Sequence, residues 1–211
     1  MAISKKSAEN ISKVLSEALP YIQKFSGKTI VIKYGGSAMN ETYLRKSFAR
    51  DIVLMKTVGI NPIIVHGGGP QIKKELDKKN IKSTFLNGVR ITSTEMINSV
   101  QKVLDNQVNK EIVDLINSWG GKAQALSGKR SSFIKAKKIS DKRLGEVGEI
   151  VNIQKKIILN AAKNKIPVIS PIGWDKEHKP LNINGDNVAC FLASALKAEK
   201  IILMTDVSGI K

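Results

Sequence analysis

The order of apolar and polar residues predicts alternating helices and strands in the first third of the chain. Residues 8 to 25 carry apolar side chains at the spacing of an amphipathic helix, which Pro20 is expected to kink or cut short. A β-branched run at 29 to 32 then ends at a lysine and two glycines. A second unit repeats this order, with a helix at about 41 to 57, a strand at 62 to 65 and three glycines. Strand, glycine turn, helix and strand in this order predict an α/β fold with a parallel sheet flanked by helices.

The rest of the pattern alternates in a similar way. A long helix is predicted from Ser93 to Ser118, where the glycines of WGGK end it. Short strand candidates at 122 to 126, 132 to 138 and 147 to 151 are interpreted as a hairpin region. The remaining predicted elements are a helix at about 153 to 164, one buried strand in IPVISPIG, a helix at 186 to 197 and a strand in KIILMTD.

Composition indicates a globular chain without a membrane or export segment. The 211 residues, of which 42% are hydrophobic and 25% charged, can bury a core in one large domain or slightly more. No apolar run approaches the roughly 18 residues of a membrane helix, and the N-terminus lacks the apolar core of a signal peptide. A single cysteine, Cys190, excludes an intramolecular disulfide and fits a reducing compartment. We therefore expect a soluble protein with no membrane partner.

The net charge of +17 has two interpretations. Clustered Lys and Arg supply affinity for phosphate backbones, which would indicate a nucleic-acid-binding protein. Here the lysines are spread through predicted helices and turns without interleaved aromatic residues, which make up only 5% of the chain. That distribution favours a solvated lysine surface and no nucleic-acid partner. The frequent Lys, Asn and Ile are also typical of an AT-rich genome, such as that of an organelle.

Two glycine clusters fall where a parallel sheet binds ligands. Gly35 and Gly36 follow the first predicted strand, and Gly67, Gly68 and Gly69 follow the second. Ligands bind beyond the carboxyl ends of parallel strands, and glycine lets backbone N–H groups approach an anion closely. Neither cluster matches the P-loop or the dinucleotide fingerprint. Tight strand-to-helix turns are the structural alternative, but two clusters after two successive strands favour a ligand site.

Five polar residues are candidates for the chemistry. Lys33 ends a strand directly before glycines, where its ammonium can stabilise phosphate oxygens, although a strand-end lysine can also simply reach solvent. Arg90, in NGVRIT, is suited to a bidentate bond with a carboxylate. In LNINGDN, Asn182 and Asn184 fall on one face of an extended segment. Asp186 stands at a helix start, where it is either a plain helix cap or a functional group.

Together these motifs resemble one family. VIKYGGSAM, IIVHGGGPQI, NGVRIT, LNINGDNVA and LMTDVSGI occur in an order and spacing similar to those of the acetylglutamate kinases, within the amino acid kinase family. The resemblance covers essentially the whole chain and implies a three-layer α/β/α sandwich with a mainly parallel central sheet. It also implies phosphoryl transfer from ATP, with Mg²⁺ and no protein-held metal cluster, to the side-chain carboxylate of N-acetyl-L-glutamate. That reaction is the second step of arginine biosynthesis.

The resemblance assigns roles to the glycine turns and their charged neighbours. Lys33 would stabilise the phosphoryl group during transfer, and Gly36 would contact it through its backbone. Gly68 and Gly69 would hold the substrate. Asp186 would orient the catalytic lysines.

Further residues would bind the remainder of the acceptor. The resemblance implies that Arg90 binds the α-carboxylate of acetylglutamate and that Asn182 binds its α-carboxylate and acetamido region, with Asn184 also on the substrate side. A carboxylate with a pKa of about 4.3 is already ionised at neutral pH, so the reaction needs no general base. Positioning and the neutralisation of like charges remain the tasks of the site.

The last residues resemble the start of the family's ATP site. The resemblance implies that Thr205, Asp206, Ser208 and Gly209 lie near the nucleotide. The family's second catalytic lysine and most of its adenine pocket would lie beyond Lys211. We therefore expect these 211 residues alone to bind acetylglutamate better than they turn over ATP, and to be inactive as a kinase.

The resemblance also divides the chain into three parts. These are an N-terminal helix at 1 to 26, an acetylglutamate-binding lobe at 27 to 198 and the start of an ATP-binding lobe at 199 to 211. The helix is similar to an extension that links dimers into hexamers in arginine-inhibited members, and an ordinary packing helix is the alternative. We expect L-arginine as a feedback inhibitor, a homo-oligomer (a hexamer in the complete protein), the PII signalling protein as a further partner, and a location in the cytoplasm or the plastid stroma.

Three alternatives remain open. Carbamate kinase, glutamate 5-kinase, aspartokinase and UMP kinase share the strand, lysine and glycine start, whereas NGVRIT with HGGGP favours an N-acylated amino acid. The second alternative is a non-catalytic module that binds acetylglutamate or arginine. The third is a basic nucleic-acid-binding protein.

Overall fold

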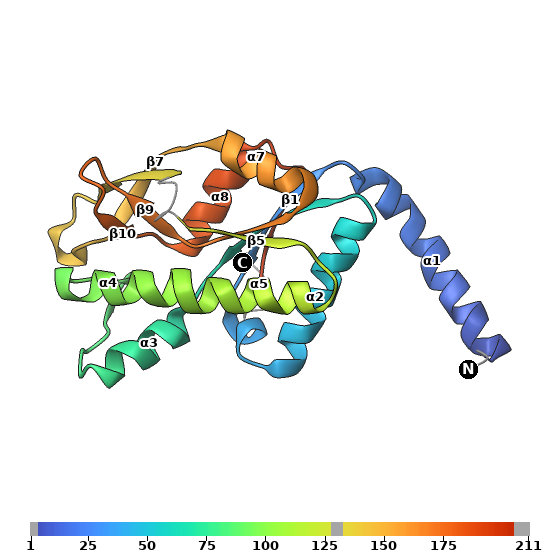
Figure 1. Cartoon of the computed structure of the whole chain (residues 1–211), viewed down its shortest axis with the longest axis horizontal. Coiled ribbons are helices and arrows are strands. Elements are labelled where there is room, and N and C mark those ends of the chain that lie inside the picture. Colours follow the sequence, from blue (N-terminus) through green and yellow to red (C-terminus); the bar gives the residue numbers. More distant parts are fainter. Residues whose placement is uncertain (1–3, 128–132, 205–211) are drawn as a thin grey trace.

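In a computed structural model, the chain folds around a five-stranded parallel sheet with helices on both faces (Figure 1). The structure describes residues 4–127 and 133–204. The strand order is β11-β1-β2-β8-β5, and every neighbouring pair is parallel. The strands are β1 (Thr29–Tyr34), β2 (Asn61–His66), β5 (Ala123–Leu126), β8 (Ile166–Ile169) and β11 (Lys200–Leu203). The predicted parallel sheet is confirmed.

Side chains of the central strands alternate between two cores, as the period of two in a strand requires. Ile30 and Ile32 of β1 belong to one core, whereas Val31 belongs to the other. The helices are α2 (Thr42–Thr57), α3 (Gly69–Lys78), α4 (Thr94–Lys102) and α5 (Asn109–Ser118) around the first core, and α7 (Lys155–Asn164) and α8 (Gly185–Ala195) around the second. The three-layer α/β/α arrangement is therefore confirmed.

A smaller sheet and a hairpin complete the body. The smaller sheet has the strand order β10-β9-β6-β7. Its strands are β6 (Ile134–Lys138), β7 (Gly148–Ile153), β9 (Ile172–Trp174) and β10 (Pro180–Asn182). The hairpin joins β3 (Phe85–Leu86) to β4 (Val89–Arg90), and two short 3-10 turns are η1 (Gly36–Met39) and η3 (Lys142–Leu144).

Two predictions about strands are wrong in this region. The strand predicted at 122 to 126 does not belong to the predicted hairpin region, in which β6 pairs with β7. It forms β5, which pairs in parallel with β8 in the central sheet. IPVISPIG is not one strand but two, β8 and β9, which belong to different sheets. The chain leaves the central sheet at Ser170 and Pro171, where proline cannot donate a ladder hydrogen bond.

The helix predicted from Ser93 to Ser118 has the expected extent but contains a π turn. Val103–Val108, labelled η2, separates α4 from α5. Within it the Asn109 N–H donates to the Leu104 carbonyl, five residues earlier. Apolar spacing did not reveal this wider turn, which lies directly beneath the second glycine cluster.

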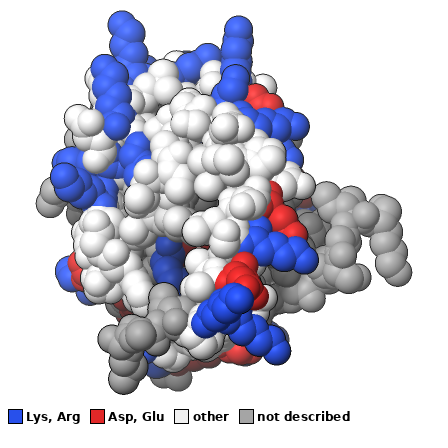
Figure 2. All heavy atoms as spheres, turned by 90° about the vertical axis from the view of Figure 1, so that its right-hand side faces the viewer, with Lys and Arg blue, Asp and Glu red and all other residues white. Residues whose placement is uncertain are grey.

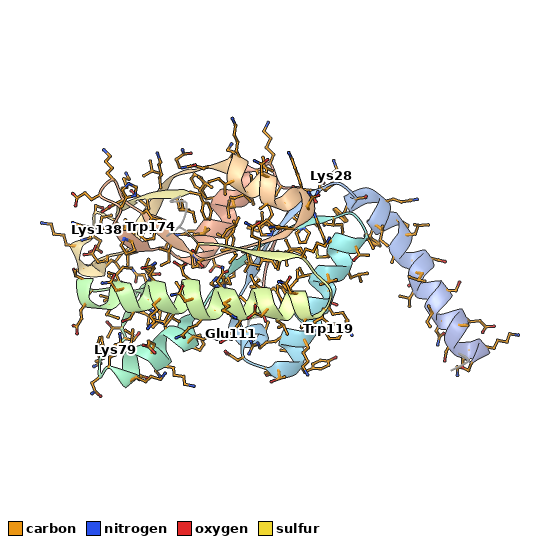
Figure 3. The ribbon with its side chains drawn as sticks, viewed as in Figure 1. Lys28, Lys79, Glu111, Trp119, Lys138 and Trp174 are labelled. Carbon is orange, nitrogen blue, oxygen red and sulfur yellow. The ribbon has the colours of Figure 1, made fainter. Side chains whose placement is uncertain are left out.

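Helix α1 (Lys5–Phe25) projects from the body and has no buried residue (Figures 1 and 3). Lys28, labelled in Figure 3, marks the point where the chain enters the sheet. The helix continues past Pro20 to Phe25, so of the two predicted effects, a kink or an early end, the early end is wrong. Proline leaves the carbonyl four residues earlier without a partner, but Ser16 is exposed and its carbonyl can bind water.

Basic side chains are scattered over the surface. Figure 2 shows Lys and Arg at separate points of one face, several of them beside Asp or Glu. Ion pairs between exposed side chains include Arg45 with Glu111 and Lys137 with Glu149. Among the described residues, no helix has the length and apolar character needed to cross a membrane.

Candidate active site

A cavity of about 180 Å³ lies at the carboxyl ends of β1 and β2. It brings together most of the residues predicted for catalysis and substrate binding: Lys33, Gly68, Gly69, Arg90, Asn182, Asn184 and Asp186. Gly36 lies in η1, after the same strand as Lys33, and does not line this cavity. Thr205, Asp206, Ser208 and Gly209 lie outside the described residues.

The first glycine turn leaves room for the Lys33 ammonium. Its Nζ lies 3.2 Å from a carboxylate oxygen of Asp186, and the lysine side chain is only 17% exposed. A Cβ on Gly35 would come within 2.7 Å of that nitrogen, so a larger residue here would push the ammonium away from its present position. Gly36 adopts φ 65°, a conformation that side chains with a Cβ rarely tolerate.

Asp186 does not cap a helix, which was the structural alternative to a functional role. The N-cap of α8 is Asn184, whose Oδ1 accepts from the N–H of Asp186 at 2.7 Å. Asp186 therefore lies in the first turn of α8 and turns its carboxylate toward Lys33. The side-chain oxygen of Asn184 therefore caps α8, whereas the resemblance implied that Asn184 lies on the substrate side.

Arg90 reaches the cavity from β4 and is only 7% exposed. One guanidinium nitrogen donates to the Gly69 carbonyl at 3.1 Å and another donates to the Ser83 hydroxyl. The guanidinium also lies 4.6 Å from the centre of the Phe85 ring. Burial lowers the pKa of Arg90, but an arginine remains charged in proteins. The side chain is thus a fixed positive charge with further N–H donors available to an anion.

The motifs around Arg90 and Asn182 are joined by hydrogen bonds. The Asn182 Nδ2 donates to the Thr92 hydroxyl at 3.1 Å, and that hydroxyl donates to the Arg90 carbonyl at 3.0 Å. These hydrogen bonds, one of them between residues 90 positions apart in the sequence, connect Arg90 to Asn182, and both of these side chains line the cavity.

Sequence reasoning missed the side chain that supports the second glycine turn. His66 is fully buried, and its Nδ1 donates to the Gly67 carbonyl at 2.7 Å. Its Nε2 lies 3.1 Å from the Nδ2 of Asn109, which is also fully buried. Burial lowers the pKa of His66 to about 4, so the ring is neutral near pH 7. A histidine directly before the glycines was the one signal for this contact.

Sequence reasoning also missed Tyr34, which supports the first turn. Its hydroxyl donates to the Ala38 carbonyl within η1 at 2.7 Å, and its ring stacks on Phe48 with the ring centres 3.7 Å apart. The Gly67 N–H donates to the Tyr34 carbonyl at 2.8 Å, which ties the two turns together.

The assembled groups are suited to binding anions. Two cations, Lys33 and Arg90, and the second glycine turn line the cavity, and among the described lining residues the carboxylate is that of Asp186. Clustered N–H groups and fixed cations stabilise carboxylates and phosphates, and they can offset repulsion between two anions held together. Among the described residues, no group of three or more His, Cys, Asp or Glu is placed to hold a metal ion.

Residues 28–211 match the model of the amino acid kinase family. A relative named acetylglutamate kinase, from a Marinomonas species, is 51% identical over 224 residues, covering 100% of this chain and 74% of the relative. Another relative of that name, from Marinobacter nauticus, is 50% identical and covers 95% of this chain and 74% of the relative. The chain thus spans about three quarters of the length of these relatives.

Solved structures agree with this match. A crystal structure of a Streptococcus mutans protein is 33% identical with a TM-score of 0.80, covering 87% of this chain and 74% of the other. An N-acetylglutamate synthase of Neisseria gonorrhoeae, in complex with coenzyme A and N-acetyl-glutamate, has the same TM-score of 0.80 at 20% identity, over 93% of this chain and 46% of the other. At that identity the second similarity shows the fold alone.

Proposed function

The chain belongs to the amino acid kinase family, and we propose that it carries out the acetylglutamate kinase reaction. The product would be N-acetyl-L-glutamyl 5-phosphate, in arginine biosynthesis. The observation that carries the proposal is the ion pair of Lys33 with Asp186 beside two glycine turns, in a chain half identical to relatives of that name. A non-catalytic binding module is not favoured, because relatives named acetylglutamate kinase are about half identical to this chain. The ion pair of Lys33 with Asp186 supports the same choice.

In this reaction the side-chain carboxylate of acetylglutamate attacks the γ-phosphorus of ATP. A carboxylate oxygen forms the new P–O bond, the bond from the γ-phosphorus to the β-phosphate oxygen breaks, and ADP leaves with that electron pair. The nucleophile is already ionised at neutral pH, so the reaction does not require Asp186, the carboxylate among the described lining residues, to act as a base while it is paired with Lys33. The work of the site is to hold two anions together in line.

Lys33 is proposed to stabilise charge on the transferring phosphoryl oxygens. Asp186, 3.2 Å away, fixes the direction of the ammonium and leaves its other N–H donors for the phosphate. Gly36 is proposed to present its N–H from η1 to the same group. Gly68 and Gly69, which line the cavity, are proposed to bind the acceptor substrate through their backbone.

Arg90 and Asn182 are proposed to bind the acceptor's α-carboxylate, with Asn182 also near the acetamido group. Arg90 is held by its hydrogen bond to Gly69, and Asn182 by its hydrogen bond to Thr92. Both side chains therefore lose little conformational entropy when the substrate binds. Asn184 is proposed to contribute through its amide nitrogen, because its oxygen caps α8.

ATP is proposed to approach from the end of β11, where Thr205, Asp206, Ser208 and Gly209 follow. The lobes proposed are residues 27 to 198 for the acceptor and 199 onward for the nucleotide. The Mg²⁺ that accompanies ATP would be held by phosphate oxygens, since Asp186 is paired with Lys33.

Helix α1, which has no buried residue, is the basis for a proposal about oligomer assembly and regulation. Its apolar residues Ile11, Val14, Leu15 and Leu19 are all at least 49% exposed, so a second copy of this helix can cover them. We propose that residues 1 to 26 link copies into a hexamer inhibited by L-arginine. The PII protein remains a proposed partner, and the compartment proposed is a bacterial cytoplasm or a plastid stroma.

A substrate panel tests the function. Full-length protein should release ADP with N-acetylglutamate and much less with glutamate, aspartate, carbamate or UMP. The Arg90→Ala variant should chiefly raise KM for acetylglutamate, because it removes a buried cation from the acceptor end. Preference for an acceptor without the acyl group, or an Arg90→Ala variant with unchanged substrate affinity, would contradict the proposal.

A further inference from the structure

The Gly67–Gly68 peptide is held from one side by a buried ring. His66 Nδ1 lies 2.7 Å from the Gly67 carbonyl oxygen, which can only accept, so this nitrogen carries the proton. The described peptide bonds are trans, and in a planar trans peptide the N–H points opposite to the C=O. Fixing the Gly67 carbonyl toward His66 therefore fixes the Gly68 N–H on the opposite side. Gly68 itself lines the cavity.

Asn109 lies against the other nitrogen of the ring. Its Nδ2 lies 3.1 Å from His66 Nε2 and 3.0 Å from the Val168 carbonyl oxygen. Because that carbonyl cannot donate, the amide nitrogen and not the amide oxygen must face it. His66 Nε2 then faces an amide nitrogen, which cannot accept a hydrogen bond, and this agrees with a ring proton on Nδ1. The same amide nitrogen also lies 3.1 Å from the Ser170 hydroxyl. Ser170, also fully buried, completes this group with its hydroxyl 3.3 Å from His66 Nε2.

The π turn brings two side chains to this point. In an α-helix, residues five apart are separated by about 140° around the axis, since one turn takes 3.6 residues. In η2 the Asn109 N–H donates to the Leu104 carbonyl, so the two residues stack on one side of the helix. Leu104 packs beneath Gly68, where an added Cβ would lie 2.6 Å from its Cδ2 atom, and Asn109 meets His66.

We propose that His66 is a positioning residue whose Nδ1–H holds the Gly67 carbonyl and thereby aims the Gly68 N–H at the reacting anions. The π turn serves this purpose by supplying Asn109 to hold the ring and Leu104 to support the glycine. This inference rests on the proposed phosphoryl transfer, because the benefit of a fixed N–H is charge stabilisation in that step.

A measurement on the unmodified protein tests the geometry without turnover. The full-length protein is labelled with ¹⁵N-histidine, and the ring nitrogens of His66 are observed by NMR at pH 7. The 211 residues contain two histidines, His66 and His178. Because His178 is exposed, the substitution His178→Asn removes its ring signals and so distinguishes them from those of His66. A proton on Nδ1 with a bare Nε2 is expected. A proton on Nε2, or a charged ring at pH 7, would overturn the proposal.

Two substitutions then separate positioning from packing. In His66→Asn the amide nitrogen can occupy the place of Nδ1 and still donate to Gly67, whereas in His66→Gln it reaches only the place of Nε2. We expect His66→Gln to lower kcat about 100-fold with KM for acetylglutamate changed less than about 3-fold, and His66→Asn to keep kcat within about 10-fold of the parent. His178→Asn serves as the control for kinetics as well.

Equal losses in both variants, or a loss confined to KM, would overturn the positioning role. Failure of the parent protein to release ADP with acetylglutamate would instead overturn the proposed function, while the His66 tautomer would still report on the peptide. If His66→Gln does not fold, the ring measurement on the parent protein still decides whether Nδ1 holds the Gly67 carbonyl.

Discussion

The two glycine turns lie side by side at the ends of β1 and β2 but need glycine for different reasons. Gly36, in the first turn, has φ 65°, which is the left-handed region. Gly68, in the second, has an extended φ of 164°, which any residue can adopt, and its constraint is the contact with Leu104. A pair of glycines in a sequence therefore does not say whether conformation or space is the requirement.

The residues that anchor the two turns differ as well. Tyr34 and His66 are paired neighbours on adjacent strands, and each donates to a carbonyl of the turn that follows it. Burial raises the pKa of Tyr34 to about 12 and lowers that of His66 to about 4. Lys33, which we propose to stabilise the transferring phosphate, lies just before the first turn, whereas the second turn offers neutral N–H groups. The first turn thus lies beside a positive charge, whereas the second holds a peptide group in a fixed orientation.

Removing the charge of the first turn should have the largest effect. Lys33→Ala in the full-length protein is expected to lower kcat by about 10²- to 10³-fold with a smaller change in KM, because the lysine acts on charge that develops during transfer. Lys28→Ala, an exposed lysine just before the same strand, is the control and should leave kcat within about 2-fold. An effect of Lys33→Ala mainly on KM would count against a role in the transition state.

Acid should destabilise the second turn more than the first. A folded pKa of about 4 lies below the unfolded value of about 6.5, so the unfolded state binds the proton first as the pH falls. The stabilising contribution is complete above about pH 6.5 and is lost down to pH 4, amounting to roughly 3 kcal/mol. Urea unfolding of the parent and His66→Asn from pH 7 to pH 4 measures this. Parallel pH curves would contradict a buried neutral ring.

Alkali should act on the first turn instead. The folded pKa of Tyr34 is raised to about 12, so the unfolded state loses its proton first and stability falls as the pH rises above 10. Tyr34→Phe should remove this alkaline dependence and, at pH 7, cost about 1 kcal/mol for the lost bond to Ala38. Denaturant unfolding at pH 7 and pH 10.5 gives both numbers. A variant that stays as sensitive to alkali as the parent would place the dependence elsewhere.

The smallest expected effects separate the two uses of glycine. Gly36→Ala should destabilise the protein by about 1–2 kcal/mol through its positive φ. Gly68→Ala should cost a similar amount, about 1–2 kcal/mol, through overlap with Leu104. Adding Leu104→Ala should recover part of the second loss and none of the first, as a double-mutant cycle measures. Equal coupling of Leu104→Ala to both glycine variants would remove the distinction.

Sequence patterns predicted the parallel sheet, its glycine turns and most of the cavity lining. They succeeded because Lys33, Arg90 and Asp186 stand at strand ends or helix starts, which local spacing locates. They missed the group around His66, whose partners lie 43 residues away at Asn109 and 104 away at Ser170. Contacts at that separation depend on tertiary packing, which periodicity does not encode.

Two local features also escaped prediction for physical reasons. The π turn keeps the apolar spacing of a helix on both sides, so the run from Ser93 to Ser118 reads as uniform. At the strand break before Pro171, Ser170 is buried and accepts a hydrogen bond from Asn109, a contact that local spacing does not encode. Both irregular segments lie beside the hydrogen-bonded group of His66, Asn109 and Ser170, where tertiary contacts outweigh local propensity.

The central claim is that a carboxylate oxygen of the acceptor receives the phosphoryl group in this cavity. N-acetylglutamate labelled with ¹⁸O in its side-chain carboxylate is incubated with ATP and the full-length protein, and hydroxylamine is added to attack the carbonyl carbon of any acyl phosphate. Mass spectrometry of the released inorganic phosphate should then show one ¹⁸O atom, because the bridging oxygen stays with phosphorus. Unlabelled phosphate would mean that water, and not the carboxylate, attacked ATP, and would contradict the account.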